Sequence, residues 1–164
     1  WFPRSSAMAV FDPHQLPRES PFSKVVASHT SNDDTISAIG DRKEPKYSSG
    51  KKVPRWTSRP QTEKSQWIEA RFHGTKSLRS VGVYWMQDQF DVKFPAEWSL
   101  EIEQNGEWKP FELYVTDRYD TRANQYNVVH PAAPVRCDAI RVLMTPKPKS
   151  CVGILEIMPE FEGG

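Results

Sequence analysis

Three polar stretches of the chain combine aromatic rings with planar polar side chains. They are residues 55–59, 85–91 and 119–126, in which Trp, Tyr and Phe stand beside Arg, Asp, Asn and Gln. A sugar presents a flat C–H face and a rim of hydroxyl groups. An aromatic ring suits the face, and planar polar groups that make paired hydrogen bonds suit the rim. These three loops therefore supply the residue types that a carbohydrate site would need.

Candidate contacts come from all three stretches, and they are Trp56, Arg59, Trp85, Gln87, Asp88, Tyr119, Arg122 and Tyr126. Burial in the core is an alternative for two of them. Trp56 could pack beneath the preceding loop, and Trp85 ends a predicted strand on its inward phase. Arg59 has the alternative of pairing with a nearby acid on a solvated surface.

Catalytic machinery is not indicated, so we expect no enzymatic activity. The 4 histidines are scattered, and none stands at metal-ligand spacing from a cysteine. The chain has no phosphate-binding glycine loop and no Gly-x-Ser-x-Gly motif. The paired acids at residues 33–34 and at residues 88 and 91 are interpreted as solvated loop carboxylates.

The elements that must position these loops are short strands. Apolar and polar residues alternate with a period of two at residues 67–72, 81–85 and 98–103. Asn105-Gly106 predicts a two-residue hairpin, and Pro110 in the return strand predicts a sheet edge. A helical turn is expected within residues 33–39, with Asp33 or Asp34 as its N-cap. Further strands are expected at residues 25–27, 107–114, 138–144 and 152–157. This pattern predicts an all-β fold, an antiparallel β-sandwich of the jelly-roll kind.

Length and charge limit the remaining possibilities. The 164 residues are sufficient for one domain, with residues 1–22 as a linker or N-terminal arm and residues 23–164 as the sandwich. The net charge of +1 argues against nucleic acid or an anionic membrane as the main partner. No apolar run reaches the roughly 18 residues that a membrane-spanning helix needs, so we expect no membrane insertion. We expect a monomer.

The two cysteines are predicted to be free thiols. Strands at 138–144 and 152–158 are interpreted as a direct hairpin, which would place Cys137 and Cys151 at its opposite ends. That separation would exceed the Cα distance of about 7 Å that a disulfide allows.

Several ordered segments carry a resemblance to a known family. They include residues 26–28, Gly40-Asp41, residues 66–69, residues 95–98, residues 105–108 and residues 155–157. Taken together over residues 25–161, they resemble the discoidin or coagulation factor 5/8 type C family of galactose-binding-like jelly rolls. Many members are family-32-type carbohydrate-binding modules. Residues 27–31, 34–38 and 153–156 further resemble the C-terminal sandwich of bacterial glycoside hydrolases related to family 127.

The resemblance implies a non-catalytic carbohydrate-binding module of a multidomain bacterial glycoside hydrolase. Its partners would be a plant or host polysaccharide or oligosaccharide and a catalytic domain in the same parent chain. The catalytic barrel of those enzymes is a separate domain, so no catalytic residue is carried over. Secretion to an extracellular or periplasmic location is also implied. Two alternatives stay open: a structural accessory sandwich with an apolar patch at Trp1, Phe2 and Phe11, and a discoidin-type protein or lipid binder with apolar loop tips.

The resemblance also implies a structural calcium ion in the first long loop. Calcium prefers several hard oxygen ligands, and the matching acidic residues are Asp41, Glu44 and Glu156. Residues 41–46 are more basic than the usual family loop. The alternative is that Asp41 caps a turn and Glu156 pairs with a side-chain cation.

Overall fold

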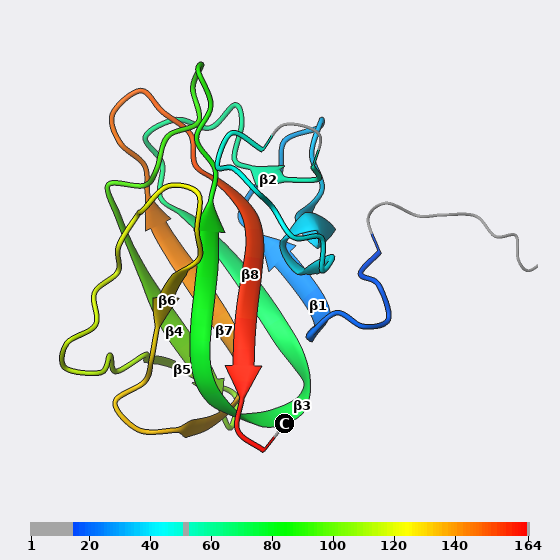
Figure 1. Ribbon diagram of the computed structural model, residues 1–164, viewed down its shortest axis with the longest axis vertical. Coiled ribbons are helices and arrows are strands. Elements are labelled where there is room, and N and C mark those ends of the chain that lie inside the picture. The colour runs from blue at the N-terminus through cyan, green and yellow to red at the C-terminus, as the bar shows by residue number, and fades with distance from the viewer. Residues whose placement is uncertain (1–14, 51–52, 164) are drawn as a thin grey trace, which may run out of the picture.

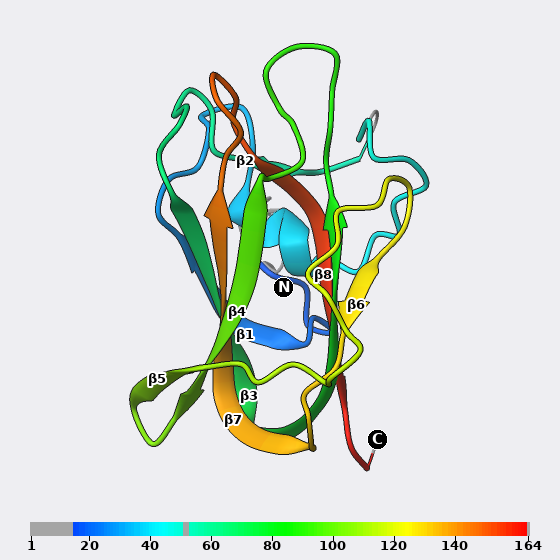
Figure 2. The ribbon, with the colours of Figure 1, turned by 90° about the vertical axis from the view of Figure 1, so that its left-hand side faces the viewer.

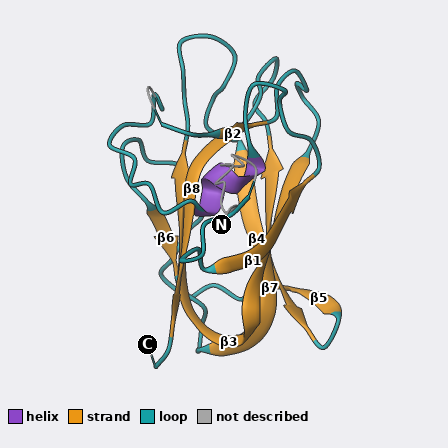
Figure 3. Cartoon of the chain, turned by 90° about the vertical axis from the view of Figure 1, so that its right-hand side faces the viewer, coloured by secondary structure: helices purple, strands orange, loops and turns teal. Residues whose placement is uncertain are grey.

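The computed structural model describes residues 15–50 and 53–163, which form two facing layers of strands (Figures 2 and 3). One layer contains β1 (Phe22–Ala27), the first half of β3 (Gln66–Trp85), β7 (Val135–Thr145), β4 (Glu97–Gln104) and β5 (Glu107–Pro110). The other contains β6 (Asn127–Val129), the second half of β3, β8 (Gly153–Phe161) and β2 (Trp56–Thr57). All pairings between these strands are antiparallel. The predicted antiparallel β-sandwich is therefore confirmed.

The 20-residue strand β3 belongs to both layers (Figure 1). Residues 66–72 pair with β1 and β7, whereas residues 78–85 pair with β8. The alternation predicted two separate strands here. The chain instead curves round from one layer into the other as one continuous strand (Figure 3), with Gly74 at φ +86° near the bend, and pairing with β7 resumes at Lys76. Gly74 has open space around it, so backbone freedom rather than close packing explains this glycine.

The apolar faces of the two layers meet in one core. The period-two alternation directs Ile68, Leu100 and Val142 inward from one layer. Val83 and Ile157 point inward from the other. A smaller buried cluster lies beneath the loops and contains Tyr84, Met86, Val92, Cys151 and Leu155.

The first strand, β1, and the last strand, β8, both pair with β3. Phe22 begins β1 opposite Phe72 of β3, and Phe161 ends β8 opposite Leu78. The Phe72 ring lies 6.1 Å from the Phe22 ring and 5.0 Å from the Phe161 ring. The first and last strands thus start and finish side by side, away from the long loops at the upper end of Figure 1.

Hairpin predictions had mixed outcomes. Asn105 and Gly106 have φ values of 51° and 82°, and the flanking strands pair across them, so this hairpin is confirmed. β5 lies at the end of the strand order, which confirms the edge position of Pro110. The hairpin between β7 and β8 was wrong, because each strand pairs with β3 in a different layer. Cys137 and Cys151 are nevertheless free and buried.

The expected helical turn is present as a 3-10 helix, η2 (Ile36–Gly40). Its N-cap residue is Thr35, so the expected cap at Asp33 or Asp34 was wrong. Asp34 instead accepts hydrogen bonds from Thr57 and from Arg55 Nε, the latter at 3.1 Å. Of the predicted arm, residues 1–14 lie outside the described part, and Leu16 packs against the core. Within the described ranges no helix has the length and hydropathy to span a membrane.

Candidate functional site

Two of the three predicted loops are joined through Ser48. Its carbonyl oxygen accepts a hydrogen bond of 2.9 Å from Gln87 N. Its amide donates to Asn124 Oδ1 at 2.8 Å, and Asn124 N donates to Ser48 Oγ at 2.8 Å. The stretches 85–91 and 119–126 are therefore brought together by a serine that lies in neither of them.

The third loop meets residues 85–91 through Arg59. Its Nε lies 2.7 Å from Asp91 Oδ1, and its guanidinium also pairs with Asp88. Asp88 Oδ1 accepts hydrogen bonds from Phe90 N at 2.9 Å and Val92 N at 3.0 Å, so this carboxylate also shapes the loop. The predicted alternative for Arg59, a pairing with a nearby acid, is what the structure shows.

Phe90 is the exposed aromatic ring at this site, and sequence reasoning did not select it. It is 80% exposed, on the same loop as the exposed Gln87 and Gln89. The sequence did contain a signal for this exposure. Phe90 lies beyond the last residue of the alternating strand pattern, so the pattern does not direct its ring into the core. We call Arg59, Gln87, Asp88, Phe90 and Asp91 the loop-end site.

Trp56 and Trp85 are corrections to the predicted site. Both are 0% exposed, so neither ring offers a face to a ligand in this structure. Trp56 Nε1 donates to His29 O at 3.0 Å and to Thr30 Oγ1 at 3.1 Å. Trp85 packs edge-on against Trp98, with ring centroids 5.2 Å apart. Burial was the alternative interpretation for both: Trp56 beneath the preceding loop, and Trp85 on the inward phase of its strand.

The three predicted residues of the 119–126 loop lie in different environments. Tyr119 is fixed against β4, since its hydroxyl accepts a hydrogen bond of 3.2 Å from Leu100 N. Arg122 is exposed and lies 3.6 Å from Asp120. Tyr126 packs edge-on against Tyr84, and its hydroxyl is 3.5 Å from Glu44 Oε2. Of these three side chains only Arg122 is exposed, and its guanidinium is paired with Asp120.

The predicted metal residues converge in part. The Asp41 carboxyl group lies near that of Glu156, and Arg42 N donates to Glu156 Oε2 at 3.2 Å. Glu156 is 1% exposed, and its Oε1 is buried without a hydrogen-bond partner. Burial, and then Asp41, raise the pKa of Glu156 to about 10. Burial also raises the pKa of Asp41. The Glu156 carboxyl group is therefore protonated at neutral pH.

The carboxyl groups of Asp41 and Glu156 could bind a cation, but they supply too few ligands by themselves. A divalent ion could replace the proton on Glu156 and satisfy its buried, unpartnered Oε1 atom. However, within residues 15–50 and 53–163 no group of three or more His, Cys, Asp or Glu side chains is arranged to hold a metal ion. A calcium ion held by Asp41 and Glu156 would need backbone or water oxygens for its other ligands. Pairing of Glu156 with a side-chain cation was wrong, because the described residues include no ion pair to it.

The two-layered sandwich with its polar loop end defines a discoidin-like domain. Residues 24–157 match the F5/8 type C domain, and the chain belongs to that family. Comparison with curated proteins gave no significant match.

Solved structures share this fold at low sequence identity. A chain of the Streptococcus pneumoniae β-galactosidase BgaA aligns with a TM-score of 0.70 at 18% identity, covering 89% of this chain and 96% of that one. The family 32 carbohydrate-binding module of Clostridium perfringens NanJ, solved with galactose, has a TM-score of 0.64 and 12% identity, covering 82% and 90%. A family 32 module from a Clostridium perfringens family 31 glycoside hydrolase has a TM-score of 0.61 and 13% identity, covering 85% and 92%.

Proposed function

We propose that this domain is a non-catalytic carbohydrate-binding module of a multidomain glycoside hydrolase. The observation that carries the proposal is the exposed Phe90 ring on the loop whose Asp88 and Asp91 pair with Arg59. A sugar ring would lie on Phe90, and its hydroxyl groups would meet the amides of Gln87 and Gln89 and the free lone pairs of Asp91. The family membership and the carbohydrate-binding modules among the similar structures support this assignment.

The geometry favours a neutral sugar from a plant or host polysaccharide. Arg59 is already paired with two carboxylates, which leaves this cluster with one net negative charge. A shallow contact on one ring buries little area, so the dissociation constant should be about 0.1–1 mM. Such a module raises the local concentration of an attached catalytic domain at its substrate. An extracellular or periplasmic location belongs to the same proposal.

Removing the Phe90 ring is expected to abolish glycan binding without unfolding the domain. Phe90→Ala should weaken binding by at least about tenfold, because the stacking surface is lost. Affinity gel electrophoresis against a polysaccharide panel, followed by calorimetry on the best ligand, measures this. Tyr114→Ala is the matched control, since Tyr114 is an exposed aromatic residue on another loop. Equal binding by wild type and Phe90→Ala, or equal losses in the two variants, would contradict the assignment.

One observation favours a second candidate function, a lipid or protein binder. Phe90 is an exposed apolar side chain at a loop tip, as such a domain requires. Asp88 and Asp91 flank it, so we expect no cosedimentation with phosphatidylserine vesicles. Cosedimentation that is lost in Phe90→Ala would favour the lipid binder instead. The patch expected for a structural accessory domain, at Trp1, Phe2 and Phe11, lies outside the described residues.

We further propose that Asp41 and Glu156 hold a structural calcium ion, with Glu44 close by. At pH 7.5, calcium at about one hundred times its dissociation constant should stabilise the fold by about 2.7 kcal/mol. That corresponds to a rise in Tm of roughly 5–10 °C. Thermal melts in EDTA and in calcium measure the shift, and Glu156→Gln should remove it. An unchanged wild-type melt would remove calcium from the proposal.

A further inference from the structure

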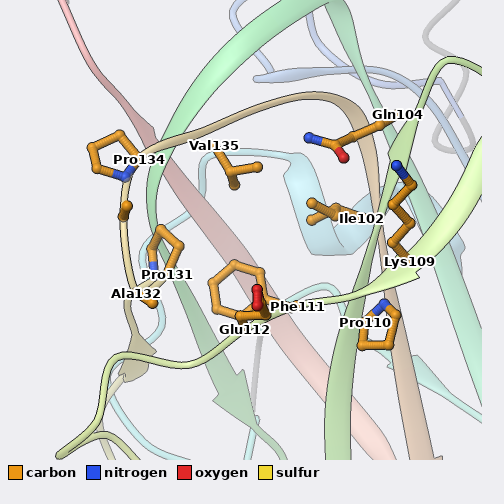
Figure 4. Close-up of a pocket in the computed structure, with 11 residues that line it drawn as sticks. Ile102, Gln104, Lys109, Pro110, Phe111, Glu112, Pro131, Ala132, Pro134 and Val135 are labelled. Atoms are coloured by element: carbon orange, nitrogen blue, oxygen red, sulfur yellow. The ribbon is translucent and has the colours of Figure 1, made fainter.

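A hollow lies where β4 ends and β7 begins (Figure 4), at the other end of the sandwich from the loop-end site. Its volume is about 690 Å³, which lies within the range of small-molecule sites. Its floor is Ile102, Phe111 and Val135, and its walls include three prolines, Pro110, Pro131 and Pro134. We call this hollow the proline pocket.

The proline pocket is held open by the fold itself. Ile102 and Phe111 are each 5% exposed and belong to the main core, so the floor is fixed. The two sides are tied by a hydrogen bond of 2.8 Å from Ala132 N to Glu112 O and by the bridge between Leu113 and Pro131. Proline walls have no backbone freedom about φ. A ligand would therefore meet little ordering cost in binding.

The lining chemistry does not suit a sugar. Prolines, alanines and Phe111 leave the hydroxyl groups of a sugar without partners, which is unfavourable in a buried position. The side-chain amide of Gln104 already donates to Arg136 O at 2.8 Å. An aromatic or other apolar body matches the walls better, since its burial is favourable in proportion to its area.

Two charged side chains at the rim of the proline pocket indicate which polar groups its ligand would carry. Lys109 and Glu112 line the pocket and are exposed, and neither belongs to an ion pair within the described ranges. Figure 4 places Lys109 beside Gln104 on one side of the hollow, opposite Pro131 and Pro134. Lys109 suits a carboxylate, and Glu112 suits a hydroxyl donor.

We propose that the proline pocket binds a hydroxylated aromatic acid, with its ring between the prolines and its carboxylate at Lys109. This site is separate from the loop-end site and does not depend on glycan binding. A ligand of this size should bind with a dissociation constant of about 1 mM.

Titration with 4-hydroxycinnamate, followed by amide NMR shifts, tests the site. We expect saturable shifts at Ile102, Ala132 and Val135, and none at residues 87–91. The methyl ester should bind about two- to fivefold more weakly, and Lys109→Met should remove that difference. Absence of shifts around the pocket would overturn the site. Equal binding of acid and ester by the wild type would overturn the assigned ligand class.

Filling the pocket gives an independent test. Ala132→Phe should weaken 4-hydroxycinnamate binding at least tenfold, because Ala132 lines the hollow and is itself exposed. If Ala132→Phe has a lowered Tm, Ala133→Phe on the same segment replaces it in the test. Ala123→Phe is the matched control, an exposed alanine on the 119–126 loop, and should bind as the wild type does. Unchanged binding in folded Ala132→Phe and Ala133→Phe would overturn the proposal.

Discussion

Trp56→Ala is expected to destabilise the domain by about 3–5 kcal/mol, the range for removing a large aromatic side chain from a packed core. Trp56 is 0% exposed and lies in the main core, and its indole N–H is hydrogen-bonded to His29 O and Thr30 Oγ1. The substitution leaves a cavity and two acceptors without their donor. Urea denaturation gives the change in the free energy of unfolding.

Any loss of glycan binding in Trp56→Ala would therefore reflect unfolding rather than a lost contact. Phe90→Ala is the comparison, because an exposed ring should change the free energy of unfolding by less than about 0.5 kcal/mol. A Trp56→Ala protein that is as stable as wild type and no longer binds glycan would show that Trp56 reaches the ligand after all.

The calcium-free domain is expected to lose stability as the pH rises above about 4.5. The folded-state pKa of Glu156 is raised from 4.5 to about 10, so between these values the folded protein holds a proton that the unfolded chain releases. The free energy of unfolding then falls by up to about 1.4 kcal/mol per pH unit. From pH 5.5 to 7.5 the loss should be roughly 2–3 kcal/mol, or a fall in Tm of roughly 5–10 °C. Thermal melts in EDTA across this range measure it.

Two substitutions separate this effect from other titrations. Glu156→Gln should flatten the pH dependence and stabilise the calcium-free protein at pH 7.5, because an amide needs no proton to remain uncharged. Asp33→Asn removes an exposed acid of the first long loop that does not act on Glu156, and it should keep the wild-type slope. If the wild type melts at the same temperature at pH 5.5 and pH 7.5, Glu156 does not hold a proton in the folded state.

The fold was predictable because its signals are local. Period-two alternation depends on which face of a strand is buried, and the Asn105-Gly106 turn depends on two adjacent residues. The partner strand of β7 and of β8 was not predictable in this way. Nearness in sequence suggested a hairpin, but both strands pair with β3, whose continuity past Gly74 places them in different layers.

The site was predictable only as a set of loops. The contact between residues 55–59 and 85–91 depends on an ion pair between Arg59 and Asp91, which sequence spacing does not reveal. The link to residues 119–126 passes through Ser48, a residue with no distinguishing pattern around it. Strand phase and loop position did predict whether each of two rings is buried. The inward phase of Trp85 argued for the core, and the loop position of Phe90 argued for exposure.

The junction of Phe22 and Phe161 at Phe72 also sets how the domain would respond to mechanical force. Because β1 begins and β8 ends at neighbouring positions on β3, tension applied through these two residues would open the strand pairs from one end. Hydrogen bonds would then break in succession rather than all being sheared at once. A domain pulled in this direction would unfold at low force. The chain would lengthen first at this end, and the loops at the other end would stay folded longest.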